Sequence, residues 1–123
     1  MTEWNDKEPI YRQIEARIIG LILDGSLPEG EAIPSVRALA SDYQINHLTV
    51  SKAYQELVAR ELLEKRRGLG MFVATGARQA LQEEQARQFI EQELPAFLAR
   101  IKQLGIDHDT IIDAIRTSQE PDV

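Results

Sequence analysis

Cysteine is absent from this 123-residue sequence, and histidine occurs only twice. Disulfide bonds, thiolate nucleophiles and zinc sites built from cysteine are therefore excluded, and two histidines leave little for a histidine-rich metal site. No apolar run approaches the roughly 18 residues that a membrane-spanning helix requires. The first residues, Met1 to Trp4, are acidic and lack the basic and apolar regions of a secretory signal. These absences favour a cytoplasmic protein that uses no metal or other cofactor and contacts no membrane.

Positive charge is also scarce, because the formal net charge of the chain is −6. Taken as a whole, an acidic chain is a poor match for nucleic acid, since phosphate binding depends on Lys and Arg. The distribution of the charges qualifies this conclusion. Between residues 35 and 76 there are six basic residues and four acidic ones, and Lys65, Arg66 and Arg67 are consecutive. This is the only basic stretch of the chain, so we expect any polyanion to bind there.

Recognisable catalytic motifs are missing as well. The run Gly68-Leu69-Gly70 lies between two predicted strands, so it lacks the strand-to-helix context of a phosphate-binding loop. The run Asp107-His108-Asp109 is the best candidate metal cluster, but adjacent residues at a helix start point in different directions. An aspartate there also interacts favourably with the helix dipole. The sequence therefore predicts neither an enzyme nor a metal site.

The first half of the chain shows the apolar spacing of three short helices. The first is predicted to begin at Pro9 and to end at Gly25. Ser35 can cap the second helix, and Asn46 can cap a third helix that runs to about Arg60. Because the second and third helices are separated by a tight connection, they have the order of a helix-turn-helix.

Two short β-prone runs follow, 62–65 and 71–74, with a glycine-containing basic connector at 66–70. Such a pattern predicts a β-hairpin with a basic tip. Three helices followed by a two-stranded ribbon is the order of a winged helix-turn-helix. We therefore expect residues 1–76 to form a domain that is mainly α-helical with one small β-hairpin.

Residues 77–123 are predicted to form a helical appendage, in which Pro95 kinks or breaks a long helix and Gly105 ends it. A last helix leads to a tail that frays from Ser118. Two helices of this length cannot enclose a core of their own, so their apolar stripe must cover residues 1–76 or meet another chain. Packing on the first helix is one alternative, and a symmetric dimer is the commonest solution. The stripe that we expect to form the dimer consists of Phe89, Ile90, Leu94, Phe97, Leu98, Ile101, Leu104, Ile111, Ile112 and Ile115.

The start of the third predicted helix carries the clearest indication of function. In a helix-turn-helix the second helix of the motif lies in the major groove and reads bases with its N-terminal residues. The side chains at this end can bond base edges or phosphates, and Leu48 can contact a thymine methyl. A solvated helix face is the alternative, and Thr49 also suits a local helix-start role. A basic hairpin tip suits the minor groove, with Gly68 allowing close approach. The residues that we expect at DNA are Ser35, Arg37, Asn46, His47, Leu48, Thr49, Ser51, Lys52, Arg66, Arg67 and Gly68.

Five motifs follow one another along the chain: PIYRQI at 9–14, GSLPEG at 25–30, IPSVRALA at 33–40, TVSKAYQEL at 49–57 and GLGMFV at 68–73. In this order and at this spacing they resemble the DNA-binding domain of GntR-family bacterial transcription regulators. The short two-helix tail is similar to that of the YtrA-type subfamily, which lacks the large effector domain of other members.

The resemblance implies a homodimer, held by its tail helices, that binds an inverted-repeat operator in double-stranded DNA and usually represses transcription. It implies that Arg37 contacts bases or phosphate, that the helix start from Asn46 to Ser51 contacts the operator and that Gly68 lies at the wing. Members of the subfamily often control transporter operons, and the resemblance is compatible with an unidentified small-molecule effector. Two alternatives stay open: a winged-helix module that binds an acidic protein without specific DNA binding, and a small-molecule sensor.

The sequence departs from the family pattern at several positions. Gln44 stands where the turn before the third helix usually has Gly, so the turn must accept a side chain. Glu61 replaces another usual Gly, and a left-handed backbone there would cost about 1–2 kcal/mol. The pair His47 and Leu48 is less polar than expected, which implies a different operator sequence. Met71 replaces a usual Thr beside the wing.

Overall fold

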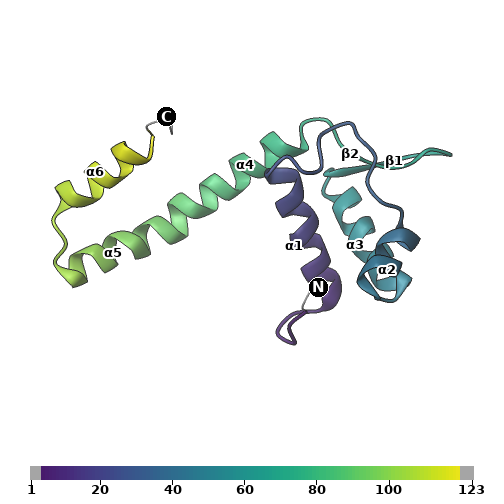
Figure 1. Ribbon diagram of the computed structural model, residues 1–123, viewed down its shortest axis with the longest axis horizontal. Helices are drawn as coiled ribbons and strands as arrows, with labels where there is room; N and C mark the ends of the chain where they lie inside the picture. The colour runs from purple at the N-terminus through teal and green to yellow at the C-terminus, as the bar shows by residue number, and fades with distance from the viewer. Residues whose placement is uncertain (1–3, 120–123) are drawn as a thin grey trace. The chain divides into compact units, whose positions relative to one another are not determined.

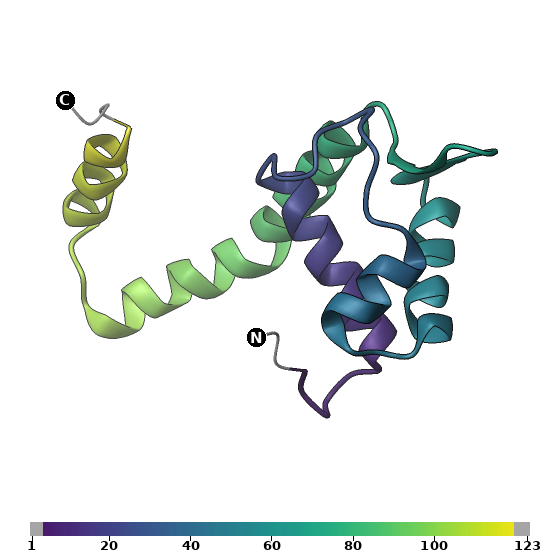
Figure 2. The same ribbon diagram turned by 45° about the vertical axis from the view of Figure 1, so that its right-hand side comes forward.

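The computed structural model describes residues 4–119, and Figures 1 and 2 show it from two directions. The chain forms two compact units, Met1–Glu83 and Glu84–Val123, and the helix α4 carries the chain from the first to the second. None of the described helices is long and apolar enough to cross a membrane. In chain order the elements are α1 (Ile10–Leu23), α2 (Val36–Tyr43), α3 (His47–Ala59), β1 (Leu63–Arg66), β2 (Gly70–Val73), α4 (Ala77–Gln88), the π-helical turn η1 (Phe89–Glu93), α5 (Leu94–Leu104) and α6 (His108–Ser118).

These elements confirm the predicted fold class, which is mainly α-helical with one small β-hairpin and a helical region after it. The predicted division after residue 76 coincides with the start of α4, whereas the two compact units meet within that helix. The assignment of DNA binding to residues 1–76 and of dimerisation to residues 77–123 stays a prediction. Residues 1–3 of the acidic N-terminus and residues 120–123 of the tail lie outside the described residues.

Polar side chains begin α2 and α3, as the sequence predicts. Ser35 Oγ accepts a hydrogen bond from the backbone N–H of Ala38 at 3.0 Å, and Asn46 Oδ1 accepts one from Leu48 at 2.8 Å. Each bond satisfies an N–H group that has no partner within its own helix. The first helix begins one residue later than predicted, with Pro9 in the capping position.

The two non-glycine residues in left-handed backbone conformations are Gln44, with φ of 55°, and Glu61, with φ of 63°, among the residues that the structure describes. Gln44 thus places a side chain in the turn, as expected, and the left-handed backbone that was considered for Glu61 is present. Gln44 ends α2, and its backbone allows the chain to turn sharply into α3. The strain is accepted because the packing of the flanking helices determines the conformation of the turn.

The β-hairpin forms at the predicted place, with each strand shifted by one residue from the expected bounds. Strands β1 and β2 are antiparallel, and Leu63 pairs with Val73 while Arg66 pairs with Gly70. In both ribbon views the hairpin projects beyond the three helices (Figures 1 and 2). The backbone N–H of Ile33 donates to the carbonyl of Met71 at 2.9 Å, so the loop before α2 lies along the open edge of β2.

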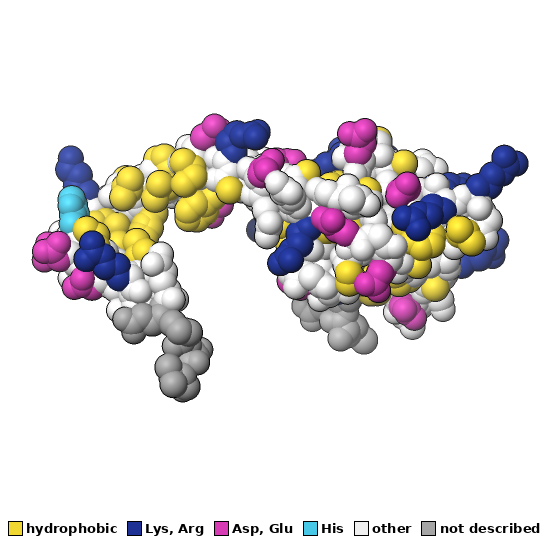
Figure 3. Space-filling view, turned by 90° about the horizontal axis from the view of Figure 1, so that it is seen from above, with side chains coloured by type: hydrophobic (Ala, Val, Ile, Leu, Met, Phe, Trp, Pro, Cys, Tyr) yellow, Lys and Arg dark blue, Asp and Glu magenta, His cyan; other side chains and the backbone are white. Residues whose placement is uncertain are grey.

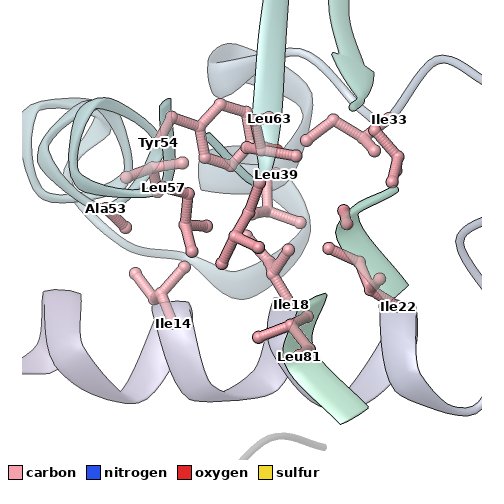
Figure 4. Packing of buried hydrophobic residues seen from close by; sticks show 14 of the residues in the cluster. Ile14, Ile18, Ile22, Ile33, Leu39, Ala53, Tyr54, Leu57, Leu63 and Leu81 are labelled. Carbon is pink, nitrogen blue, oxygen red and sulfur yellow. The ribbon is translucent and has the colours of Figure 1, made fainter. Parts of the chain in front are cut away.

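The hydrophobic core of the first unit lies between α1 and α3 and extends to the hairpin and the start of α4, as Figure 4 shows. Its largest member is Tyr54, whose hydroxyl donates a hydrogen bond to the carbonyl of Pro34 at 2.7 Å. Burial raises the pKa of Tyr54 well above its usual range, so the phenol stays neutral. This bond ties the loop before α2 to the middle of α3 and thereby fixes the two helices of the motif. The other side chains labelled in Figure 4 are Ile14, Ile18, Ile22, Ile33, Leu39, Ala53, Leu57, Leu63 and Leu81.

The irregularity predicted at Pro95 is present in the second unit, but the chain stays helical there: α4 passes into a π-helical turn and then into α5. Proline has no N–H group and clashes with the carbonyl of the residue four positions earlier in an α-helix. Here the N–H of Leu94 donates to the carbonyl of Phe89, five residues back, and α5 then begins with Pro95 in its first turn. Single π-helical turns of this kind occur where a regular α-helix is locally distorted. Gly105, with φ of 68°, ends α5 as predicted.

The last helix begins after Asp107, which lies at the capping position although its carboxylate accepts no capping hydrogen bond from the helix. Of the three isoleucines expected to be buried by this helix, Ile111 is half-buried, and Ile112 and Ile115 are exposed in the single chain. The single chain therefore leaves two of these apolar side chains uncovered. Two short helices present too little partner surface to cover them.

Candidate nucleic-acid interface

The N-terminal turn of α3 presents its side chains on the surface of the first unit. His47 and Leu48 are exposed, and Leu48 retains 66% of its accessible surface although it is apolar. Thr49 and Ser51 are half-buried. The amide oxygen of Asn46 accepts the capping bond, and the amide NH₂ group is not used by that bond and can donate to a ligand. This turn can therefore offer hydrogen-bonding groups and one apolar contact to a groove.

Arg37 lies in the first turn of α2, close to the start of α3. It lines a shallow hollow together with Ser41, Asn46, His47 and Leu48. The structure thus brings together side chains from both helices of the predicted motif. No described residue forms an ion pair, hydrogen bond or ring contact with the Arg37 side chain, so its charge is not neutralised within the described part of the chain.

A second hollow lies between α3 and the hairpin and contains two polar residues that the sequence prediction did not include. Gln55 and Lys65 line it beside Ser35 and Ser51. Gln55 Nε2 donates to Ser51 Oγ at 3.4 Å, which orients both side chains on the exposed face. The position of Gln55, seven residues after Leu48 on one helix face, was the available signal. Lys65 belongs to the basic stretch where we expect a polyanion to bind, but its place in this hollow depends on how the hairpin packs on α3, which the sequence does not show.

The hairpin tip carries two arginines in different situations. The Arg66 guanidinium lies 4.1 Å from the centre of the Phe72 ring and 3.5 Å from the Glu64 carboxylate, so contacts within the hairpin already hold it. Arg67 is exposed, and no described residue pairs with it. Gly68 has φ of 76°, a left-handed conformation that glycine adopts without strain, and it forms part of the hairpin turn. Figure 3 shows Lys and Arg side chains at the end of the first unit where the hairpin projects.

Lys52 lies at the edge of α3 that faces α1, away from the two hollows. Its Nζ atom is 4.2 Å from the centre of the Tyr11 ring, and the Arg12 guanidinium lies 5.0 Å from the same ring. Tyr11 raises the pKa of Arg12 the most, and the buried Glu15 raises it to a smaller extent. The Arg12 guanidinium also forms an ion pair with the buried Glu15 carboxylate at 3.4 Å, so Lys52 is the one of these two cations that no described carboxylate pairs with.

The predicted dimerisation residues all lie in the second unit, with Phe89 and Ile90 in its π-helical turn. Ile101 is buried, and Leu94 and Ile111 are half-buried. The other seven are exposed: Phe89, Ile90, Phe97, Leu98, Leu104, Ile112 and Ile115. Hydrophobic side chains also gather over the helical region in Figure 3. Among the described residues there is no group of three or more side chains that could hold a metal ion.

Three packed helices, an exposed start of the third helix and a basic hairpin beside it define a winged helix-turn-helix DNA-binding protein. The profile described as "Bacterial regulatory proteins, gntR family" matches residues 10–73, and the chain belongs to this family of DNA-binding transcription regulators. The family consists of regulators that bind DNA and not of enzymes. Membership in it supports the DNA-binding interpretation over the protein-interaction module and the sensor.

The chain is similar to the HTH-type transcriptional repressor YtrA of Bacillus subtilis, at 38% identity over 99 residues that cover 80% of this chain and 70% of that protein. A GntR family transcriptional regulator from Listeria monocytogenes is 30% identical, with 93% of this chain and 98% of that chain covered and a TM-score of 0.71. The DNA-binding domain of AraR, in complex with the operator ORR3, is 28% identical, with 60% of this chain and 89% of that chain covered and a TM-score of 0.54. The resemblance to a YtrA-like GntR regulator is confirmed.

Proposed function

We propose that this regulator acts in the cytoplasm as a homodimer that binds an inverted-repeat operator and represses transcription. The observation that carries the proposal is the exposed, nearly uncharged start of α3, placed between Arg37 on one side and the basic hairpin on the other. A repressor named as such, YtrA, is among the proteins to which the chain is similar. Binding of a regulator at a promoter blocks the polymerase without any further chemistry, so no catalytic group is required.

In this proposal, base reading and phosphate binding are divided between different residues. His47 and Leu48 are placed to meet base edges, and Leu48 offers its apolar surface to a thymine methyl. The unneutralised side chains of Arg37, Lys65 and Arg67 supply the cations that phosphates attract, although the chain as a whole is acidic. Ser35, Asn46, Thr49, Ser51, Lys52, Arg66 and Gly68 complete the proposed interface.

Dimerisation is proposed to occur through the exposed apolar side chains of the second unit. Seven large apolar residues exposed within 40 residues exceed what a solvated helical surface normally carries. A closed two-fold interface would bury the same set on both chains and leave no apolar surface open. Two first units joined in this way match an operator that has two-fold symmetry.

Selection from a pool of random duplexes with the purified protein tests this proposal directly. The expected result is enrichment of a palindrome, whose affinity falls steeply as salt rises because several phosphates are contacted. Random duplex competitor supplies the control for non-specific charge contact. Enrichment of no sequence, by a protein whose fold is intact, would contradict specific operator binding.

A further inference from the structure

A long-range cap joins the loop between α1 and α2 to the first turn of α4. Glu29 Oε2 accepts a hydrogen bond from the backbone N–H of Gly76, and Glu29 Oε1 accepts one from the backbone N–H of Arg78, both at 3.0 Å. The first N–H groups of a helix have no partners within the helix, and a carboxylate there also meets the positive end of the helix dipole. Glu29 lies in a loop and precedes Gly76 by 47 residues. It thus provides the helix cap that a Ser, Thr, Asp or Asn next to the helix usually provides.

Arg78 makes a contact in the opposite direction, from α4 to the end of α1. Its Nε donates a hydrogen bond to the carbonyl of Leu23 at 3.0 Å, and α1 has no basic residue in its own last turn. Arg78 therefore places a positive charge at the C-terminal end of α1, where the helix dipole is negative. Hydrogen bonds from Ser26 and, less strongly, the charge of Arg78 lower the pKa of Asp24, so a second carboxylate stays ionised near this cation.

The loop that carries Glu29 is itself held in place by the hairpin. The N–H of Gly30 donates to the carbonyl of Val73 at 2.8 Å, and the N–H of Val73 donates to the carbonyl of Glu31 at 3.0 Å. On the other side of the cap, Ala77 and Leu81 of α4 are almost fully buried in the core of the first unit. Polar bonds and apolar packing therefore act on the same first turns of α4, within the first unit.

We propose that Glu29 and Arg78 are positioning residues that fix the direction of α4 on the first unit and thereby limit the half-site spacings that the dimer accepts. The inference rests on the proposed function, because it assumes two copies joined through their second units. Helix α4 has 12 residues and is about 18 Å long. A change of about 10° in its direction would move its far end by about 3 Å, close to the rise of one base pair at about 3.4 Å. If the direction of α4 on the first unit varied, the dimer would therefore bind half-site spacings that a fixed direction excludes.

The test compares Glu29→Gln with the matched control Glu31→Gln in the full-length protein. Both substitutions remove one negative charge from the same loop, but no described residue forms a hydrogen bond with the Glu31 side chain. A glutamine at 29 keeps one acceptor and places an NH₂ group against the second N–H of the cap. The duplexes carry two copies of the selected half-site at stepwise spacings around the preferred one, and a further duplex carries a single half-site.

The wild-type protein and Glu31→Gln are expected to bind the preferred spacing about tenfold more tightly than a spacing two base pairs away. For Glu29→Gln this ratio is expected to fall to about twofold, while the affinity for the single half-site stays the same. Arg78→Ala should act in the same direction, and Arg87→Ala on the same helix should not. Amide hydrogen exchange at Gly76 and Arg78 should become about tenfold faster in Glu29→Gln only.

An unchanged spacing preference in Glu29→Gln would overturn the inference. A loss of single half-site affinity in that variant would also overturn the inference, because Glu29 would then act on the DNA-binding surface itself. A wild-type protein that binds all spacings equally would overturn it as well. Two further measurements on the wild-type protein, its affinity for two half-sites relative to one and its sedimentation, test the proposed function separately. It fails if the wild-type protein binds two half-sites no more tightly than one, or if it sediments as a single chain.

Discussion

The two units of this protein use apolar residues in opposite ways. The first unit buries its large apolar side chains, including Ile14, Leu57 and Val73 at 0% exposure, and leaves mainly Leu48 and Leu69 open. In the second unit the exposed apolar side chains outnumber the buried ones, because two short helices cannot cover one another. The comparison supports the proposal that the second unit covers its apolar side chains with another chain, whereas the first unit has a core of its own.

The largest effect is expected where the second unit lacks a core. Replacing Phe97 and Leu98 together by Glu would place four charges in a two-fold interface. We expect complete dissociation of the dimer, because burial of an unpaired charge costs far more free energy than the lost apolar contact. Light scattering should report the mass of one chain. The double variant Ala99→Glu and Gln103→Glu adds the same charge on the opposite face of α5 and should remain a dimer. If the Phe97 and Leu98 variant still has twice the chain mass, dimerisation by this stripe is wrong.

The next effect concerns the first unit alone. Arg37→Ala should weaken operator binding by about 1–3 kcal/mol, the scale of a good base contact, without changing the oligomeric state. Equilibrium binding to the selected duplex measures the loss, with Arg116→Ala in the second unit as a control. Arg37→Lys separates two roles: a full loss indicates a bidentate base contact, and a small loss indicates a phosphate contact. Binding that is unaffected by Arg37→Ala would remove Arg37 from the interface.

Within the DNA-binding surface, the wing and the start of α3 should respond differently to substitution. Arg67→Ala should weaken binding to all sequences by a similar factor and reduce the slope of log K against log salt by about 1. Leu48→Ala should leave the slope unchanged and reduce discrimination at one base pair by about 1 kcal/mol. Salt titrations with matched and mismatched duplexes measure both. Equal slopes for wild type and Arg67→Ala would show that Arg67 does not contact phosphate.

The smallest effect concerns the strained turns that flank α3. Glu61→Gly should stabilise the protein by about 0.5–1 kcal/mol, because glycine relieves the left-handed strain while its greater freedom in the unfolded chain offsets part of the gain. Glu56→Gly, within the right-handed helix, should destabilise it by about 0.5–1 kcal/mol. Chemical denaturation measures both. A destabilising Glu61→Gly would show that the side chain of Glu61 contributes more than its backbone strain removes.

Local features of the fold could be predicted from the sequence because each depends on neighbouring residues. The caps at Ser35 and Asn46, the basic hairpin, the irregularity of the helix near Pro95 and the helix end at Gly105 are all confirmed. The form of this irregularity, a π-helical turn, could not be predicted, since proline permits several ways to relieve its clash. The exposure of Ile112 and Ile115 depends on which surface covers them, and a single sequence does not contain that information.

Contacts between distant segments explain what the sequence did not show about the candidate site. Lys52 turns toward the ring of Tyr11, and Lys65 reaches the hollow beside Gln55, only because α1 and the hairpin pack on α3. The cap that Glu29 provides to α4 has no local sequence signal, since it joins residues 47 and 49 positions apart. The predicted DNA-contacting and dimerising residues themselves stay predictions until the experiments above are made.

The most direct measurement is the footprint of the wild-type protein on its selected operator. An account in which the first unit reads DNA and the second pairs two copies predicts two protected half-sites related by two-fold symmetry, with centres about 34–36 Å apart. Protection of a single half-site, at protein concentrations that saturate the duplex, would contradict it.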